Sequence, residues 1–266
     1  MPTPTAGTAV SKDGTRIAYD VTGNGATVVL VHGALGYKDV AWARKLANDL
    51  AGHFRVVSYD RRGCGGSSDT PPFSVDREID DLDAVIRAVG DSPIVVGISS
   101  GAALALEAAA RGVPIGRLVA FEAPYMVGEH RKAEHARYES EVRNLVARGD
   151  RDGALKLFMR TVGLPAVAVA VMRWMPFWKQ LRPVAHTLPY DAAFMNGFEL
   201  PSARLARVRV PTLVVGGGKS PAALKAAVRA VGGAVPGAQV VEIPDQSHNI
   251  QGSALAPVVQ RFAQAS

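Results

Sequence analysis

The chain of 266 residues has only one cysteine, Cys64, so it cannot form a disulfide within itself. A single thiol fits a reducing compartment, and a cytoplasmic location is expected. Residues 1–14 are polar and contain no apolar core of signal-peptide length, so no export signal is predicted. The longest strongly apolar stretch, Leu164–Met172, is interrupted by Pro165 and closed by Arg173, which makes it too short to span a bilayer.

Long runs of one charge sign are also missing. The formal net charge of +6 arises from 30 Lys and Arg against 24 Asp and Glu, and the arginines are interleaved with acidic residues. This pattern predicts neither a nucleic-acid surface nor a membrane surface. The spacing of histidines, cysteines and carboxylates matches no metal-ligand pattern, so neither a metal nor another cofactor is expected.

The most informative pattern that is present is Gly97-Ile98-Ser99-Ser100-Gly101, which follows an apolar run and precedes an alanine-rich helical run. A serine at such a strand-to-helix turn presents its hydroxyl as a nucleophile. Both glycines are needed, because side chains there would collide across the sharp bend. The alternative is an ordinary glycine-rich loop, which the flanking strand and helix disfavour.

Short β-branched runs alternate with amphipathic helical stretches, which is typical of a mostly parallel sheet with helices on both faces. The expected strands are Ile17–Val21, Val28–Val31, Val56–Tyr59, Ile94–Ile98, Leu118–Phe121, Thr212–Val215 and Val240–Ile243. The expected helices are Asp39–Leu50, Asp76–Val89, Ser100–Arg111, Pro221–Val235 and Ser253–Ala263. Residues 125–202 break the alternation and are expected to form a helical cap over the carboxyl ends of the strands, where such sheets bind ligands. The core domain would then comprise residues 1–124 and 203–266.

Over essentially its whole length the chain resembles the α/β-hydrolase superfamily. The motifs that carry the resemblance are Val31-His32-Gly33-Ala34, the loop Asp60-Arg61-Arg62-Gly63-Cys64-Gly65-Gly66-Ser67, the elbow at Ser99, and Asp245-Gln246-Ser247-His248 after the last strand. The resemblance implies the α/β-hydrolase fold and a triad in the chain order nucleophile, acid, histidine. Ser99 would be the nucleophile and His248 its base. The other histidines compare poorly, because they belong to the His-Gly turn, to helix ends or to the cap.

The same resemblance implies an oxyanion hole made of two backbone N–H groups, those of Ala34 and Ser100. Gly33 would let this loop approach the substrate closely. The alternative for His32-Gly33 is a simple tight turn, which its place in the strand order disfavours.

The acid of the triad is not where most relatives have it. They carry an aspartate shortly after the penultimate strand, where this chain has Ser220, and residues 200–241 contain no Asp or Glu. Glu122 ends the strand after the elbow helix, which is the acid position in haloalkane dehalogenases and in the zearalenone-type lactone hydrolases. The latter also resemble this chain in their Ser-Ser-Gly elbow, so the resemblance implies Glu122 as the acid. The alternatives are a solvated glutamate at the cap hinge and Asp245, which lies too near His248 in sequence to reach its far ring nitrogen readily.

Three further patterns have structural interpretations. Gly218-Lys219-Ser220 resembles the end of a phosphate-binding loop, but Leu213 stands where that motif needs its first glycine, so nucleotide binding is rejected. Asp60 and Arg62 are expected to brace their loop by local hydrogen bonds. Cys64 lies on the same loop without an elbow, and an incidental thiol is the better interpretation.

The predicted cap holds every methionine except the initiator, together with the aromatic residues Trp174, Phe177, Trp178, Phe194 and Phe198. Flexible thioethers and aromatic rings suit an adaptable apolar pocket. Met126, Trp174, Trp178 and Met195 are therefore predicted to contact the substrate, and packing of the cap onto the core is the alternative.

Together these patterns predict a serine hydrolase that cleaves a carboxylic ester or lactone of a small apolar molecule through an acyl-enzyme. The alternatives are a small-molecule receptor with a slow triad, and carbon–carbon bond hydrolysis or cofactor-free haloperoxidase activity at the same triad. The expected partners are the small-molecule substrate and at most a second copy in a homodimer.

Overall fold

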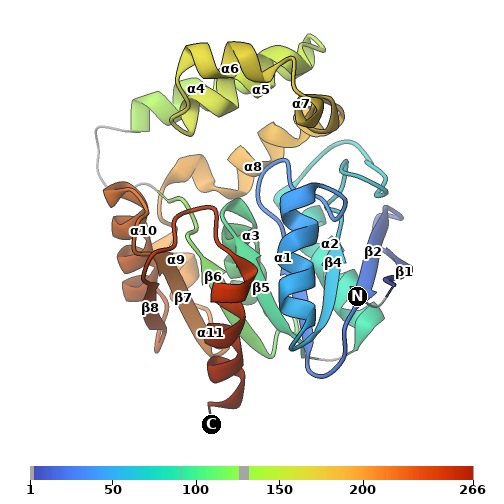
Figure 1. The fold of residues 1–266 in the computed structure, drawn as a ribbon, viewed down its shortest axis with the longest axis vertical. Helices are drawn as coiled ribbons and strands as arrows, with labels where there is room; N and C mark the ends of the chain where they lie inside the picture. Colours follow the sequence, from blue (N-terminus) through green and yellow to red (C-terminus); the bar gives the residue numbers. More distant parts are fainter. Residues whose placement is uncertain (1–2, 91, 126–131, 266) are drawn as a thin grey trace.

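The computed structural model describes residues 3–90, 92–125 and 132–265. In these residues eight strands form one sheet in the order β1-β2-β4-β3-β5-β6-β7-β8 (Figure 1). β2 pairs antiparallel with both β1 and β4, and all other neighbouring strands are parallel. This is the α/β-hydrolase fold, as predicted.

The strands are β1 (Thr5–Val10), β2 (Arg16–Thr22), β3 (Thr27–Val31), β4 (Arg55–Tyr59), β5 (Ile94–Ile98), β6 (Arg117–Phe121), β7 (Thr212–Gly217) and β8 (Gln239–Ile243). The helices that flank the sheet are α1 (Ala41–Ala51), α2 (Val75–Val89), α3 (Ser100–Ala110), α10 (Ala222–Ala234) and α11 (Gly252–Gln264). Every strand and helix predicted from the sequence is confirmed, with ends within two residues of the prediction.

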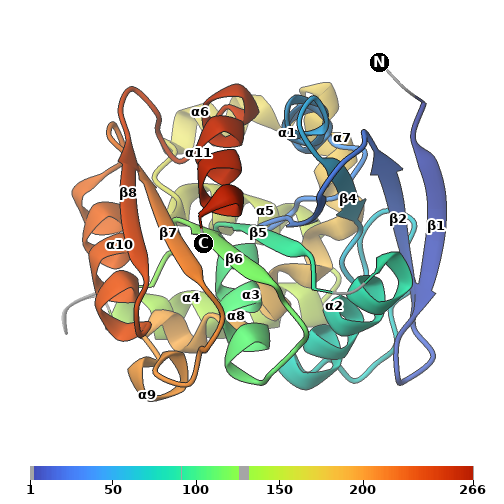
Figure 2. The same ribbon diagram turned by 90° about the horizontal axis from the view of Figure 1, so that it is seen from below.

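The central strands β3–β7 are buried on both faces, which explains why they read as continuous apolar runs. In β3, Val28 and Leu30 belong to a buried cluster that also includes residues of α1 and α11, whereas Val29 and Val31 belong to a second cluster that includes residues of α2, α3 and α10. Figure 2 shows these two helical layers on either side of the sheet. β1 escaped prediction because it is an edge strand in which only Ala9 is buried, so it lacks an apolar pattern.

Between β6 and β7 the described residues form helices and no strand. These are α4 (Lys132–Ala147), α5 (Arg151–Thr161), α6 (Ala166–Met172), α7 (Pro176–Leu181), η2 (Arg182–Thr187), α8 (Leu188–Phe194), η3 (Asn196–Phe198) and α9 (Ser202–Leu205). We call residues 132–198 the helical insertion. Its helices α4–α7 form a separate layer beyond one end of the sheet, and α8 lies between this layer and the sheet (Figure 1). The predicted domain boundaries at 124/125 and 202/203 stay predictions.

A buried apolar cluster joins the helical insertion to the loops of the core. It includes Leu35 and Ala43 from the core and Val142, Trp178 and Leu188 from the insertion. The insertion is therefore packed onto the rest of the molecule. Within the described ranges, no helix has the length and apolar character needed to cross a membrane.

Candidate active site

Ser99 stands between β5 and α3 in the strained backbone conformation expected of a nucleophile elbow, with φ 56° and ψ −125°. A Cβ atom added to Gly97 would lie 2.6 Å from the Cα atom of Ala102. At Gly101 it would lie 2.3 Å from the carbonyl oxygen of Val31. Both distances are far below van der Waals contact, so the sharp turn at Ser99 requires both glycines.

The structure brings together the three residues that were predicted to form the triad. His248 lies on the loop after β8, and its Nε2 atom is 3.1 Å from the Oγ atom of Ser99. Its Nδ1 atom is 2.7 Å from Oε2 of Glu122. These distances suit proton transfer from the serine to a histidine that a carboxylate orients. The catalytic roles themselves stay predictions.

Glu122 directly follows β6 and is fully buried, with 0% of its surface exposed. Its second carboxylate oxygen, Oε1, accepts a hydrogen bond of 2.7 Å from the backbone N–H of Gly217. Burial alone would raise the pKa of Glu122, but the hydrogen bonds with His248 and the Gly217 N–H, together with the nearby Ser220 hydroxyl, lower that pKa below its usual range. Glu122 is therefore a carboxylate at neutral pH.

The alternative acid, Asp245, does not reach His248. Its side chain is 78% exposed and pairs with Lys219, whose Nζ atom is 2.9 Å from Oδ1 of Asp245. This ion pair holds the pKa of Asp245 below its ordinary value. The solvated carboxylate in this region is thus Asp245, whereas Glu122 is buried against the histidine.

The loop after β3 lies directly against the elbow. A Cβ atom on Gly33 would be 3.0 Å from the Cβ atom of Ser99, so only a glycine lets the backbone approach so closely. In the part of the chain that the structure describes, the N–H groups of Ala34 and Ser100 have no hydrogen-bond acceptor. These two N–H groups are therefore free to donate, as the predicted oxyanion hole requires.

His32 has a structural environment. Its side chain is fully buried, contacts Trp42 edge to face, and its Nε2 atom lies 2.8 Å from the Ser58 hydroxyl. Burial and the nearby Arg61 guanidinium lower the pKa of His32 to about 3, so the ring is neutral. We therefore interpret His32 as a structural residue of the loop after β3 and not as a proton acceptor in the reaction.

The loop after β4 is braced as predicted. The carboxylate of Asp60 accepts backbone hydrogen bonds from Lys38 at 2.7 Å and from Gly66 at 2.8 Å. The guanidinium of Arg62 reaches farther, because two of its nitrogens bind the carboxylate of Asp81 on α2 at 2.6 and 2.7 Å. The loop is thereby fixed to the helical layer behind the sheet.

Cys64 on this loop is 3% exposed, and burial raises the pKa of its thiol to about 12. A buried neutral thiol is a poor nucleophile. We expect iodoacetamide at neutral pH to leave the activity of the native protein unchanged over an hour. Intact-mass measurement before and after denaturation checks this, since alkylation should appear only in the unfolded chain. Rapid alkylation with loss of activity in the native state would contradict the interpretation of Cys64 as an incidental thiol.

The sequence patterns did not predict a buried charged cluster behind the elbow. It consists of Arg61, Glu78 on α2 and Asp191 on α8, each at most 6% exposed. Arg61 pairs with both carboxylates, and Asp191 also accepts a hydrogen bond from the Ser100 hydroxyl. The one available signal was the second serine of the elbow, because a hydroxyl at so buried a position needs a partner.

The residues predicted to contact the substrate have different environments. Met126 lies outside the described residues. Trp174 is 78% exposed, whereas Met195 is 1% exposed and packs in the core. Trp178 is 3% exposed, and its Nε1 donates a hydrogen bond of 2.8 Å to Asp152. Their roles in substrate binding stay predictions.

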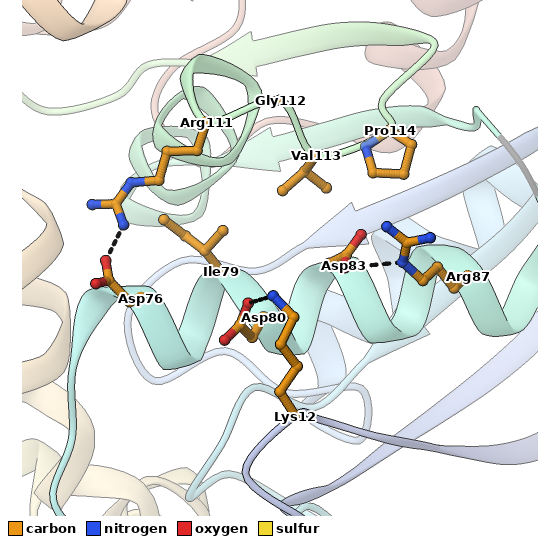
Figure 3. Close-up of a pocket in the computed structure, with 10 residues that line it drawn as sticks. All are labelled: Lys12, Asp76, Ile79, Asp80, Asp83, Arg87, Arg111, Gly112, Val113 and Pro114. Atoms are coloured by element: carbon orange, nitrogen blue, oxygen red, sulfur yellow. Dashed lines mark hydrogen bonds and ion pairs between the residues drawn. The ribbon is translucent and has the colours of Figure 1, made fainter.

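A polar groove of about 320 Å³ lies away from the triad, between α2 and the end of α3. Figure 3 shows that its charged side chains are paired with one another. The pairs are Lys12 with Asp80, Asp76 with Arg111, and Asp83 with Arg87. This groove offers no uncompensated charge to a ligand, so the elbow is the stronger candidate site.

Comparison with solved structures agrees with this architecture. An α/β hydrolase from Sphaerobacter thermophilus is 43% identical, with a TM-score of 0.86, over 97% of this chain and 100% of its own. An enol-lactonase from Burkholderia xenovorans is 21% identical with a TM-score of 0.70, over 97% of this chain and 100% of its own. At that identity the second similarity concerns the fold alone.

Curated relatives and a family model extend the comparison. A candidate non-heme bromoperoxidase of Mycobacterium tuberculosis is 27% identical over 246 residues, which are 87% of this chain and 90% of the relative. An uncharacterized hydrolase of Bacillus subtilis matches over only 98 residues, 35% of each chain, at 36% identity. The model of the alpha/beta hydrolase family matches residues 28–261. The chain belongs to the alpha/beta hydrolase family.

Proposed function

We propose that the protein is a serine hydrolase that cleaves carboxylic esters or lactones through an acyl-enzyme. The observation that carries this proposal is the hydrogen-bonded series from Ser99 through His248 to the buried Glu122, with distances of 3.1 and 2.7 Å. Nucleophile, base and orienting acid are the three groups that an activated serine requires.

In the first half of the reaction, the Oγ atom of Ser99 attacks the substrate carbonyl while Nε2 of His248 takes the hydroxyl proton. The N–H groups of Ala34 and Ser100 stabilise the oxyanion of the tetrahedral intermediate. The imidazolium donates through Nδ1 to Glu122, whose negative charge stabilises it. His248 then passes its proton to the leaving alkoxide, and the acyl group remains on Ser99.

In the second half, His248 takes a proton from a water molecule, which attacks the acyl carbonyl. A second tetrahedral intermediate collapses, His248 returns the proton to Ser99, and the carboxylic acid leaves. With a lactone the alcohol stays tethered to the acyl group, so one ring-opened product forms. The enol-lactonase with the same fold supports including lactones among the substrates to be tested.

The experiment is a screen of the purified protein against p-nitrophenyl esters of increasing acyl length and against a set of lactones. Sustained turnover of at least one ester or lactone is the expected result. A stoichiometric release of p-nitrophenol without turnover would indicate a receptor with a slow triad instead.

A second candidate function is a cofactor-free haloperoxidase activity, which the similarity to the candidate bromoperoxidase over 87% of this chain favours. Hydrogen peroxide in place of water would release a peracid from the acyl-enzyme and regenerate the Ser99 hydroxyl. The peracid would then oxidise bromide to hypobromite and revert to the carboxylic acid. Bromination of monochlorodimedone that requires both acetate and peroxide would support this activity, and its absence beside good ester turnover would exclude it.

The two tryptophans of the insertion should separate substrate binding from packing. Trp174→Ala should keep the free energy of unfolding, because the side chain is 78% exposed, and should change the ranking of bulky esters more than the rate on acetate. Trp178→Ala should lower the free energy of unfolding by about 3–5 kcal/mol, because it empties a buried site. Denaturant unfolding and kcat/KM on short and bulky esters measure both effects. Equal losses on all esters in Trp174→Ala would contradict its role in substrate choice.

A further inference from the structure

The Ser100 side chain connects the elbow to the helical insertion. Its hydroxyl donates a hydrogen bond of 2.8 Å to Oδ1 of Asp191 on α8. Ser100 is 4% and Asp191 6% exposed, so water competes little for this bond. The backbone N–H of the same Ser100 is one of the two donors assigned to the oxyanion hole. The residue that would hold the oxyanion is therefore anchored through its side chain to a separate segment of the chain.

Asp191 is itself held in place by Arg61. Nη1 of Arg61 donates to the same Oδ1 at 2.7 Å, and Nε of Arg61 donates to Glu78 on α2. The guanidinium also lies 4.7 Å from the ring centroid of Phe194, one turn after Asp191 on α8. Arg61 is 3% exposed. Glu78 and Phe194 thus hold the Arg61 guanidinium in place, and this guanidinium donates a charge-assisted hydrogen bond to Asp191. The Asp191 carboxylate is therefore a rigid acceptor for the Ser100 hydroxyl.

We propose that Asp191 is a positioning residue, which holds Ser100 so that its backbone N–H points to the developing oxyanion. The inference rests on the proposed hydrolase function. Ser100 follows a residue in a strained conformation and begins α3, where the first N–H groups have no partner within the helix. The peptide unit that carries this N–H is held at its carbonyl end, where Ser99 O accepts from the Ala102 N–H at 2.9 Å. The anchored Ser100 hydroxyl adds a second restraint, on the side of the N–H itself. Docking of α8 would thus complete the oxyanion hole.

The chemistry of Asp191 offers a sharp test. Its Oδ1 atom accepts both hydrogen bonds, whereas Oδ2 has no hydrogen-bond partner within the described ranges. Asp191→Asn can keep Oδ1 as the acceptor and place its NH₂ group at the position of Oδ2. Asp191→Ala removes the acceptor altogether. The two variants separate the position of Ser100 from the charge of the cluster.

A matched control exists on the same helix. The hydroxyl of Tyr190 donates a hydrogen bond of 2.9 Å to Asp69 in the core, so it also joins α8 to the core without touching the elbow. Tyr190→Phe should lower the melting temperature and leave kcat unchanged. This variant shows how much the loss of one hydrogen bond between the insertion and the core changes the melting temperature and kcat by itself.

The experiment measures kcat and KM on p-nitrophenyl acetate, together with the inhibition constant of a trifluoromethyl ketone, which adds to Ser99 as an anionic tetrahedral adduct. Ser100→Ala and Asp191→Ala should each lower kcat about 10-fold, less than the roughly 10²-fold loss for complete removal of an oxyanion donor. The affinity for the ketone should fall by a similar factor while KM changes little. The double variant should be no worse than either single one, and Asp191→Asn should recover most of the turnover that Asp191→Ala loses.

Lower melting temperatures with unchanged kcat and ketone affinity would overturn the inference, because Asp191 would then be a structural joint like Tyr190. Additive losses in the double variant would overturn it too. If Asp191→Ala does not fold, Ser100→Ala decides, since it keeps the pairing of Asp191 with Arg61. A wild-type protein without any turnover would instead refute the proposed hydrolase function, and the inference would fall with it.

Discussion

Ser99→Ala is expected to abolish ester turnover down to the level that the oxyanion hole and substrate binding supply. Removal of the nucleophile from a serine triad lowers kcat on the order of 10⁶-fold. Ser100 cannot substitute, because its hydroxyl already donates to Asp191 and lies on the helix side of the turn. Progress curves on p-nitrophenyl acetate with wild type and variant at matched concentrations give the ratio.

Covalent labelling tests the same assignment independently of any substrate. A fluorophosphonate should add one equivalent of mass to the wild type, and peptide mapping should place it on Ser99. Ser99→Ala should remain unlabelled, and Cys64→Ser should label like the wild type. A label on Ser100 or Cys64, or turnover that survives in Ser99→Ala, would refute the assignment of the nucleophile.

Sequence reasoning succeeded where local sterics or burial leave few options. The elbow follows from Gly97 and Gly101, whose missing side chains are a requirement of the turn itself. The central strands follow from continuous apolar runs, because both faces of the sheet are covered. The missing acid after the penultimate strand excluded the commonest position, and the resemblance to relatives whose acid ends the strand after the elbow helix implied Glu122, whose Oε2 atom lies 2.7 Å from Nδ1 of His248.

The features that escaped prediction depend on contacts between distant parts of the chain. Ser100 and Asp191 are separated by 91 positions, and Arg61 and Asp191 by 130, so no local pattern signals their pairing. The same holds for the two tryptophans of the insertion. Trp174 and Trp178 are one helical turn apart in sequence, yet one is 78% exposed and the other 3%. Only the packing of the insertion decides which of them meets solvent.

Glu122→Gln is the second variant with a large expected effect. The amide is nearly the same size as the carboxylate, so the fold should persist. The neutral amide cannot compensate the charge of the imidazolium. Its NH₂ group can also donate a hydrogen bond to Nδ1 of His248, which favours the tautomer with the proton on Nε2, where the ring cannot accept the proton of Ser99. In serine proteases the analogous aspartate-to-asparagine change lowers kcat about 10⁴-fold, and a loss up to that size is expected here. Asp245→Asn is the matched control and should stay within about 3-fold of wild type, since its carboxylate pairs with Lys219 in solvent.

The pH dependence of stability provides a second measurement on this variant. Because the pKa of Glu122 is lower in the folded than in the unfolded chain, its ionised form contributes stability that is fully present above the unfolded value. That stability is lost as the pH falls through the lower folded value. Wild type should therefore lose more unfolding free energy than Glu122→Gln between pH 6 and pH 3. Denaturant unfolding at each pH measures the difference.

A carboxylate introduced in the loop after β7 would show that His248 needs a negative charge beside it, rather than the glutamate at position 122 itself. Ser220 occupies the slot in which most relatives carry their acid, and its buried side chain is near enough to lower the pKa of Glu122. Ser220→Asp in the Glu122→Gln background is expected to regain part of the lost kcat, whereas Ser220→Asn, of equal size but neutral, should regain none. Near-normal turnover in Glu122→Gln with collapse in Asp245→Asn would reverse the assignment of the acid. Little loss in either variant would mean that Ser99 and His248 work as a dyad, and that the carboxylate of Glu122 only holds the loop in place.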